Sequence, residues 1–311
     1  MNMRKLAAGL AGMMVGVGFS AQALAAELLG QPTPDYIGLQ QAASPLKHSA
    51  IFFHDAILMP IITGISIFVA ILLGIIVVRF NKKSNPVPAK FTHNTALEVA
   101  WTLIPVGILL FISIFSFKLL FAYHDMPKPD LTVKATGYQW YWGYTYPDQK
   151  IDEITSVMLS EADAKKEGRP YRLAADNSLV VPVGKVVKVL VTGSDVIHNF
   201  AMPAFGLKTD AIPGRINETW FKAEKTGMFY GQCSELCGVD HAFMPIQIKV
   251  VTQEEFDAWV LTKAPPAAAA PAVTPVATPA APAAPAAPAP AAPAPQKTAQ
   301  LDVAAKPVAM N

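Results

Sequence analysis

Two stretches of the sequence consist almost entirely of apolar side chains. They cover residues 56–78 and 99–121, and each is about twenty-three residues long. As α-helices they would be roughly 34 Å long, which is enough to cross the hydrocarbon core of a bilayer. The alternative, two buried helices of a soluble core, fits this length poorly. The pattern therefore predicts two transmembrane helices.

The charges around these stretches predict their orientation. Four basic residues and no acidic residue lie between residues 79 and 97. Because loops rich in Lys and Arg stay in the cytoplasm, we expect this connection inside and both remaining ends outside. Lys118 lies near the outer end of the second stretch, where its side chain can reach the membrane interface.

The first 26 residues have the pattern of a signal peptide. Arg4 and Lys5 form a positive region, an apolar run follows over residues 6–19, and small residues at 23–25 suit a cleavage site. A short membrane anchor is the alternative, but the apolar run is short and interrupted by glycines. Export of the N-terminus agrees with the orientation that the charges predict.

Beyond the second apolar stretch, the pattern changes to short β-rich runs separated by Gly, Pro and Asp. In the last run, Ile246, Ile248 and Val250 alternate with Gln247 and Lys249, which is typical of a strand with one buried face. The other runs cover residues 131–146, 179–192 and 219–230. Such runs predict a β-sandwich or a barrel.

The end of the chain has a different character. Residues 253–261 have the pattern of an amphipathic helix, and from 264 to 295 the chain is almost only Ala and Pro. This composition cannot bury enough surface to fold and predicts an extended, disordered tail. We expect four parts in all: a signal peptide (1–26), an N-terminal segment with two transmembrane helices (27–122), a β domain (123–262) and the tail (263–311).

The composition supports a membrane protein and excludes other classes. Hydrophobic residues make up 52% of the 311 residues, charged residues only 15%, and the mean hydropathy is +0.33. The net charge of +2 and the lack of basic clusters interleaved with aromatics argue against nucleic-acid binding. Two cysteines are too few for a disulfide scaffold or a four-thiolate iron–sulfur cluster.

The strongest chemical signal is a short segment rich in metal-ligand types. Two thiols, an imidazole and a thioether occur within twelve residues, at Cys233, Cys237, His241 and Met244. Thiolates and thioethers are soft donors that favour copper, and imidazole suits copper as well. A further imidazole, His198, lies at the edge of a preceding β-rich run, and a sandwich could bring it beside this segment.

Four kinds of site are compatible with these residue types. A disulfide between Cys233 and Cys237 is open to an exported protein. Structural zinc could use both cysteines and both histidines, but it gives Met244 no role. A mononuclear blue-copper site needs one thiolate and leaves the second cysteine without a role. Two copper ions bridged by both thiolates would use every residue of the set.

The donor set and its spacing resemble the dinuclear CuA centre of the cytochrome c oxidase subunit II family. The residues that carry this resemblance are His198 and the motif Cys233-x3-Cys237-x3-His241-x2-Met244, with Leu-Lys-Thr-Asp-Ala-Ile-Pro-Gly-Arg at 207–215 between them. The likeness covers residues 48–260. It implies an α+β membrane protein in which a two-helix transmembrane hairpin precedes an all-β cupredoxin-like sandwich.

The same resemblance implies a role for each ligand. Two copper ions would be held by both thiolates, both imidazoles, the methionine sulfur and the backbone carbonyl of Glu235, which lies between the cysteines. The carboxylate of Glu235 would bind Mg²⁺ at the boundary with subunit I. No other cofactor is expected.

A second signal is the aromatic run at residues 138–146. In a strand, Trp140, Trp142 and Tyr144 would share one face and Tyr141 would lie on the other. Core packing and a preference for the membrane interface account for most of these rings. The resemblance singles out Trp140 as the exposed residue at which cytochrome c docks and its electron enters.

This part of the chain also departs from the family. Tyr138 and Thr145 stand where many members have His and Glu, so the docking contacts are expected to differ. Between residues 123 and 261 there are 14 basic and 18 acidic side chains, a net charge of −4. This sign would steer a basic cytochrome c, although a solvated acidic face explains it equally well.

A third signal is Glu98, just before the second apolar stretch. A carboxylate at this position also stabilises a helix N-terminus. In the subunit II family, the Glu before Trp-Thr-x-x-Pro lies at the entrance of a proton pathway into subunit I, and here Glu98 precedes Trp101-Thr102 and Pro105. An ionisable group at a membrane boundary suits that role.

The resemblance implies a function for the whole chain. It would be a subunit of a haem-copper cytochrome c oxidase that accepts electrons from cytochrome c at CuA and passes them to subunit I, where oxygen is reduced to water and protons are pumped. Its partners would be subunit I, the other oxidase subunits, cytochrome c and the membrane. It would span the inner (plasma) membrane with the copper domain on the periplasmic side, without a catalytic site of its own.

Three rival functions are less consistent with the sequence. Subunit II of a quinol oxidase lacks the copper ligands, all of which are present here. Nitrous oxide reductase shares the dicopper domain but needs a separate catalytic domain with many histidines, and this chain has six histidines in total. A copper store or chaperone does not account for the aromatic run.

Overall fold

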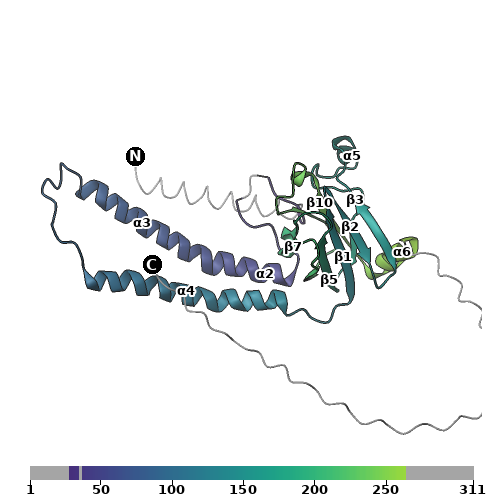
Figure 1. Ribbon diagram of the computed structural model, residues 1–311, viewed down its shortest axis with the longest axis horizontal. Helices are drawn as coiled ribbons and strands as arrows, with labels where there is room; N and C mark the ends of the chain where they lie inside the picture. The colour runs from purple at the N-terminus through teal and green to yellow at the C-terminus, as the bar shows by residue number, and fades with distance from the viewer. Residues whose placement is uncertain (1–27, 35–36, 264–311) are drawn as a thin grey trace, which may run out of the picture. The chain divides into compact units, whose positions relative to one another are not determined.

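The computed structural model describes residues 28–34 and 37–263. The expected signal peptide and residues 264–311 of the expected Ala/Pro-rich tail lie outside these residues, whereas Lys263, the first residue assigned to the tail, is the last residue of a helix. The described part contains a helical hairpin followed by a domain of ten strands (Figure 1).

The first arm of the hairpin is one continuous helical segment of 35 residues from Pro45 to Arg79. It consists of α2 (Pro45–Phe52), a π-helical stretch η1 (Phe53–Leu58) and α3 (Met59–Arg79). It begins well before the predicted apolar stretch because Ser44 caps it: the Ser44 hydroxyl accepts a hydrogen bond from the Lys47 N–H, and proline occupies the first helical position.

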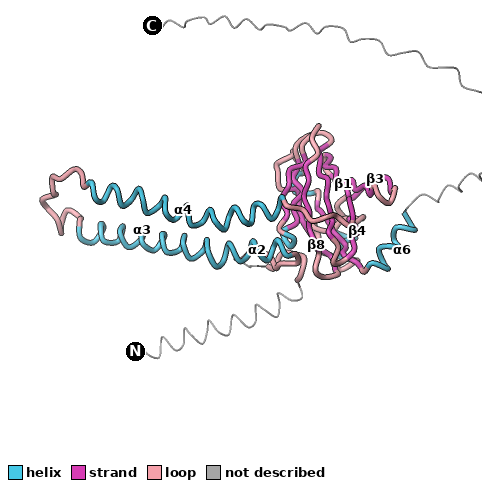
Figure 2. Tube along the Cα trace, turned by 90° about the horizontal axis from the view of Figure 1, so that it is seen from below, coloured by secondary structure: helices cyan, strands magenta, loops and turns pink. Residues whose placement is uncertain are grey.

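The second arm is α4 (Thr95–His124), which also extends beyond its predicted stretch. Asn94 caps its N-terminus by accepting a hydrogen bond from the Leu97 N–H. Both arms are long and apolar enough to cross a membrane, and α3 and α4 lie side by side in both views (Figures 1 and 2). The predicted pair of apolar helices is therefore confirmed.

The β domain consists of two five-stranded sheets. One has the order β3-β2-β1-β5-β8 and the other β4-β10-β9-β6-β7. The strands are β1 (Leu131–Tyr138), β2 (Tyr141–Tyr146), β3 (Ile151–Ser156), β4 (Leu179–Pro182), β5 (Val186–Gly193), β6 (His198–Met202), β7 (Leu207–Ala211), β8 (Asn217–Lys222), β9 (Gly227–Cys233) and β10 (Pro245–Val251). The predicted β-sandwich is confirmed.

Four short helices complete the domain. They are α5 (Glu161–Lys166), η2 (Pro203–Phe205), η3 (His241–Phe243) and α6 (Gln253–Lys263). Most strand pairs are antiparallel, but β1 pairs with β5 and β4 pairs with β10 in parallel. Consequently, segments far apart in the sequence are neighbours in both sheets.

The core of the sandwich contains large aromatic and aliphatic side chains. Trp142, Phe200 and Phe229 are completely buried, and the Trp142 ring meets the Phe200 ring edge to face at 5.5 Å. Gln247 is also buried, although the alternation in β10 predicted it on the exposed face. Its side-chain oxygen accepts hydrogen bonds from Arg169 and from the Ala175 N–H, because the segment between β3 and β4 covers this part of the sheet.

Several hydrogen bonds join the outer end of the hairpin to the sandwich. The Tyr123 hydroxyl donates to the carbonyl of Gly206 at 3.1 Å, and the Trp220 indole N–H donates to the carbonyl of Tyr123 at 3.1 Å. The Ser44 hydroxyl donates to the carbonyl of Phe205 at 2.8 Å. The end of α4 is therefore fixed to the strands that follow it.

Candidate metal centre

The loop between β9 and β10 carries most of the candidate ligands. Cys233 is the last residue of β9, Cys237 lies in the loop, His241 begins η3, and Met244 directly precedes β10. β9 and β10 are antiparallel neighbours, so their pairing closes the base of the loop. The loop therefore folds back over one end of the sandwich with its four side chains close together.

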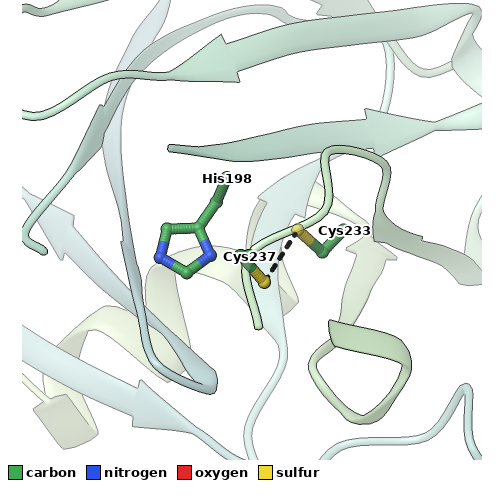
Figure 3. Close-up of side chains that lie close together, drawn as sticks. All are labelled: His198, Cys233 and Cys237. Carbon is green, nitrogen blue, oxygen red and sulfur yellow. Dashed lines mark hydrogen bonds between the residues drawn. The ribbon is translucent and has the colours of Figure 1, made fainter. Parts of the chain in front are cut away.

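His198 reaches this loop from a neighbouring strand. It is the first residue of β6, which pairs with β9 so that Phe200 lies opposite Cys233. Figure 3 shows the imidazole of His198 beside the two sulfur atoms. The sheet thus joins a ligand that is remote in the sequence to the loop.

The donor atoms lie close to one another. Sγ of Cys233 is 3.9 Å from Sγ of Cys237, and both cysteines are free thiols. Sγ of Cys237 is 3.5 Å from Nδ1 of His241 and 3.5 Å from Sδ of Met244. A ring nitrogen of His198 and both sulfurs fall within 4.8 Å of one another. All five side chains therefore border one small volume.

Glu235 lies between the two cysteines and contributes its backbone to this volume. Its carbonyl oxygen is 3.4 Å from Sγ of Cys233, whereas the residue as a whole is exposed. The carbonyl and the carboxylate can therefore serve different partners. Among the described residues, Glu235 belongs to no group of three or more His, Cys, Asp or Glu side chains that could hold a metal ion.

His198 is oriented by Asp195. Nε2 of His198 lies 2.8 Å from Oδ1 of Asp195, while Nδ1 is buried and has no hydrogen-bond partner. Burial lowers the pKa of His198, but the thiol of Cys233 and the carboxylate of Asp195 outweigh this and raise it above the ordinary value. A buried ring nitrogen without a partner is rare, and a metal ion at this place would satisfy it. The residues therefore fit a metal.

The two thiols have very different pKa values. Burial raises the pKa of Cys233, but the neighbouring imidazole of His198 and hydrogen bonds with backbone groups outweigh it and bring the pKa to about 7. Burial and then the charge of Cys233 raise the pKa of Cys237 to about 12. Near neutral pH, the pair therefore favours one thiolate. A bound cation would stabilise both thiolates and release protons.

Three residues near the ligands were not predicted from the sequence. Asp195 orients His198, and its other oxygen accepts a hydrogen bond from the Gln139 N–H at 2.7 Å. The Gln139 side chain donates to the carbonyl of Cys237 at 3.2 Å. A Cβ on Gly137 would lie 2.8 Å from the ring of His198, so only glycine fits there. The spacing of Asp195 and His198, three residues apart, was the one signal available in the sequence.

Trp140 lies in the turn between β1 and β2, not in a strand. The prediction that it shares a strand face with Trp142 and Tyr144 was therefore wrong: Trp142 and Tyr144 are completely buried in the core, while Trp140 is partly exposed. The Trp140 indole N–H donates to the carbonyl of Cys237 at 3.2 Å. The ring is thus bonded directly to the backbone of a candidate ligand.

Glu98 is not part of this cluster. It lies in the first turn of α4, while the opposite end of α4 leads into the sandwich. Glu98 lines a shallow groove together with Thr95, Val99, Thr102 and Leu103. The structure therefore separates the two predicted sites by the length of a helix of 30 residues.

Comparisons with known proteins agree with this architecture. Residues 131–251 match the family model of the cytochrome c oxidase subunit II periplasmic domain, and residues 32–119 match that of the cytochrome c oxidase subunit II transmembrane domain. Together these two matches cover both the sandwich and the hairpin.

Individual relatives carry the same name. The chain is 44% identical over 273 residues to cytochrome c oxidase subunit 2 of Cereibacter sphaeroides, covering 82% of this chain and 89% of the relative. It is 50% identical over 233 residues to a probable cytochrome c oxidase subunit 2 of Rickettsia conorii, covering 75% and 73%. A crystal structure of the periplasmic domain of subunit II of cytochrome oxidase of Bradyrhizobium japonicum shares 63% identity, with a TM-score of 0.42, covering 44% of this chain and 96% of that one.

Proposed function

The chain belongs to the cytochrome c oxidase subunit II family, and from this premise we propose that it accepts electrons from cytochrome c at a dinuclear CuA centre. The electrons pass on to the haem-copper centre of subunit I, which reduces oxygen to water and couples this to proton pumping. In this proposal, the chain binds copper and relays electrons, and it has no catalytic site of its own.

The observation that carries the proposal is the unpaired Nδ1 of His198 beside two free thiols. A buried imidazole nitrogen, two sulfurs within 4.8 Å of it and a thioether 3.5 Å from one of them are the donors that copper prefers. Zinc would leave Met244 without a role, and a single copper ion of the blue type would leave one thiol unused. Only a dinuclear site employs the whole set.

In the proposed centre, the five clustered side chains would hold two copper ions, which would supply fast one-electron transfer. The protein contributes a fixed frame. β6 and β9 hold His198 and Cys233 by backbone pairing, and Asp195 sets the orientation of the imidazole.

We assign Glu235 to both metals, as the family resemblance implies. Its carbonyl, directed toward Cys233, would complete the copper ligands, and its exposed carboxylate would bind Mg²⁺ that is shared with subunit I. Carboxylate oxygen is a donor that Mg²⁺ prefers. The remaining magnesium ligands would then come from the partner subunit or from water.

We assign electron entry to Trp140. The partly exposed indole can meet a haem edge, and its N–H donates to the carbonyl of the ligand Cys237 at 3.2 Å. This hydrogen bond supports a short route from the surface to a copper ligand. Exposed acidic residues such as Asp195 and Asp240 lie in the surrounding loops and suit a basic cytochrome c.

We assign Glu98 to the entrance of a proton pathway into subunit I. It lies at the end of α4 that joins the basic connection, which the positive-inside rule places in the cytoplasm. The sandwich then lies on the periplasmic side of the inner membrane. The signal peptide at residues 1–26 and the tail from 263 onward complete the proposed domain organisation.

A metal count on the full-length chain tests the central claim. After loading with copper in detergent, we expect two copper ions per chain and a multiline EPR spectrum of a mixed-valence pair. One copper ion or one zinc ion per chain, with a four-line spectrum or none, would contradict the dinuclear assignment.

Substitution of one bridging thiol sharpens this test. Cys233→Ser should abolish the multiline spectrum, because a hydroxyl is a harder donor that ionises poorly. Ser234→Ala changes the adjacent exposed residue and is the matched control. A multiline spectrum in Cys233→Ser would exclude Cys233 as a bridging ligand.

A further inference from the structure

A groove of about 410 Å³ lies between the first arm of the hairpin and α4, and none of the candidate metal ligands lines it. It is formed where α2 and η1 contact α4, at the end of the hairpin nearest the sandwich (Figure 1). Its lining is mostly apolar and includes Phe52, Phe53, Ile57, Phe115, Leu119 and Lys118. Three aromatic rings and one ammonium group therefore share one groove.

The charges on both helices place this groove at the outer edge of the hydrocarbon core. The first arm carries no ionisable side chain between Asp55 and Arg79, and α4 carries none between Glu98 and Lys118. Asp55 and Lys118 therefore mark the outer boundary on the two helices. The groove contains residues on both sides of this boundary, as a site for a headgroup with an attached acyl chain would.

Lys118 is the one lysine or arginine among the residues that line this groove. His54 Nδ1 lies 2.6 Å from Asp55, and His48 Nε2 lies 3.0 Å from Glu224. Among the described residues, Lys118 forms no ion pair, and it is exposed. An exposed ammonium beside an apolar groove complements a phosphate that carries an apolar chain. A free phosphate would leave the aromatic lining unused.

The wall of the groove has an unusual backbone. Phe53 and Ile57 belong to η1, where the Met59 N–H donates to the carbonyl of His54, five residues earlier. π-helical turns are rare and occur often at functional sites, because they redirect side chains out of the regular helical row. This geometry is independent of the charge at Lys118 and supports the same site.

We propose that this groove binds one anionic phospholipid of the outer leaflet. Its phosphate lies at the ammonium of Lys118, and one acyl chain lies against Ile57 and Phe115, on the hydrocarbon side of Asp55 and Lys118. The site is separate from the proposed copper chemistry, so its failure would leave that function unaffected, and the reverse is also true.

Lipid retention by the purified, assembled oxidase tests this site. Native mass spectrometry should show that the wild type retains one more phosphatidylglycerol per complex than Lys118→Gln after detergent washing. Lys118→Arg keeps the charge and should retain the lipid. Lys83→Gln removes one exposed positive charge from the opposite end of the hairpin and should behave as wild type. Copper content should be the same in all four proteins.

Three results would overturn the proposal. They are equal retention in Lys118→Gln and wild type, equal retention of phosphatidylcholine in place of phosphatidylglycerol, and loss of the bound lipid when inorganic phosphate is added. A photoreactive benzoylphenylalanine at position 115, with Lys118 intact, gives a second measurement if Lys118→Gln fails to assemble. A lipid adduct supports the site, and an adduct with another subunit overturns it.

Discussion

The membrane hairpin and the β-sandwich bury their side chains in opposite ways. α3 and α4 contain no buried residue within this chain, whereas the sandwich encloses Trp142, Phe200 and Phe229 completely. Apolar side chains that the chain itself does not cover need lipid or other subunits around them. The sandwich therefore positions its candidate metal ligands by its own contacts, while the hairpin depends on its surroundings.

Truncating one phenylalanine in each region tests this difference most directly. Phe229→Ala should lower the free energy of unfolding of the sandwich by about 3–5 kcal/mol, because it leaves a cavity in a packed core. Phe117→Ala, at a side chain that is 56% exposed on α4, should change it by less than about 0.5 kcal/mol. Urea unfolding of the full-length chain in detergent, followed by near-UV circular dichroism, measures both. Equal losses would show that the hairpin stabilises the sandwich strongly.

The orientation of the candidate ligand His198 can be disturbed without removing any ligand. Asp195→Ala should lower the affinity for copper by about 10–100-fold, since partners that orient a metal-binding imidazole typically contribute this much. Competition with a chelator measures the affinity. Asp55→Ala, on the hairpin, is the matched control and should have no effect. Unchanged affinity in Asp195→Ala would mean that backbone pairing alone positions His198.

The two regions should also separate in kinetics. Trp140→Phe should slow electron transfer from reduced cytochrome c more than it weakens binding, because the phenyl ring cannot donate to the carbonyl of Cys237.

Glu98→Gln should slow steady-state turnover while electron entry stays unchanged. Stopped-flow kinetics at several ionic strengths distinguish these effects. If Trp140→Phe reduced only affinity, Trp140 would be a docking contact rather than the entry point.

The smallest predicted effect concerns the surface of the sandwich. Partial burial and then the hydrogen bond to Glu153 raise the pKa of Tyr138 from 10 to about 12. Because the pKa is raised on folding, this contribution to stability is complete below pH 10 and is lost between pH 10 and about 12. Glu153→Gln should lower the pKa of Tyr138, as measured by tyrosinate absorbance. An unchanged titration would exclude Glu153 as a cause of the raised pKa of Tyr138.

The sequence predicted the features that depend on local patterns. Each of these patterns lies within a short segment of the chain. The apolar stretches predicted the two long helices, the alternation predicted β10, and the spacing after β9 predicted the candidate ligands. The start of the first helix is also indicated by a local pattern, the capping residue Ser44 followed by Pro45. It was not predicted because the apolar stretch begins only at residue 56.

The features that escaped prediction depend on contacts between distant segments. The run at 138–146 contains no residue typical of a turn before Gly143, so nothing in it indicates that the chain reverses at Gln139 and Trp140. Asp195 and Cys237 fix this turn from other parts of the chain. Gln247 is likewise buried because Arg169 and Ala175 reach it from a remote segment.

The two parallel strand pairs have a consequence for the order of events during biogenesis. β1 with β5 and β4 with β10 join segments that are distant along the chain, and closing such long loops slows folding. β10 follows the ligand loop and must pair with both β9 and β4 before the second end of that loop is fixed. A chain emerging across the membrane thus presents its two thiols before it can enclose a metal. If the proposed copper centre forms, copper delivery would come last, to a domain that has already folded.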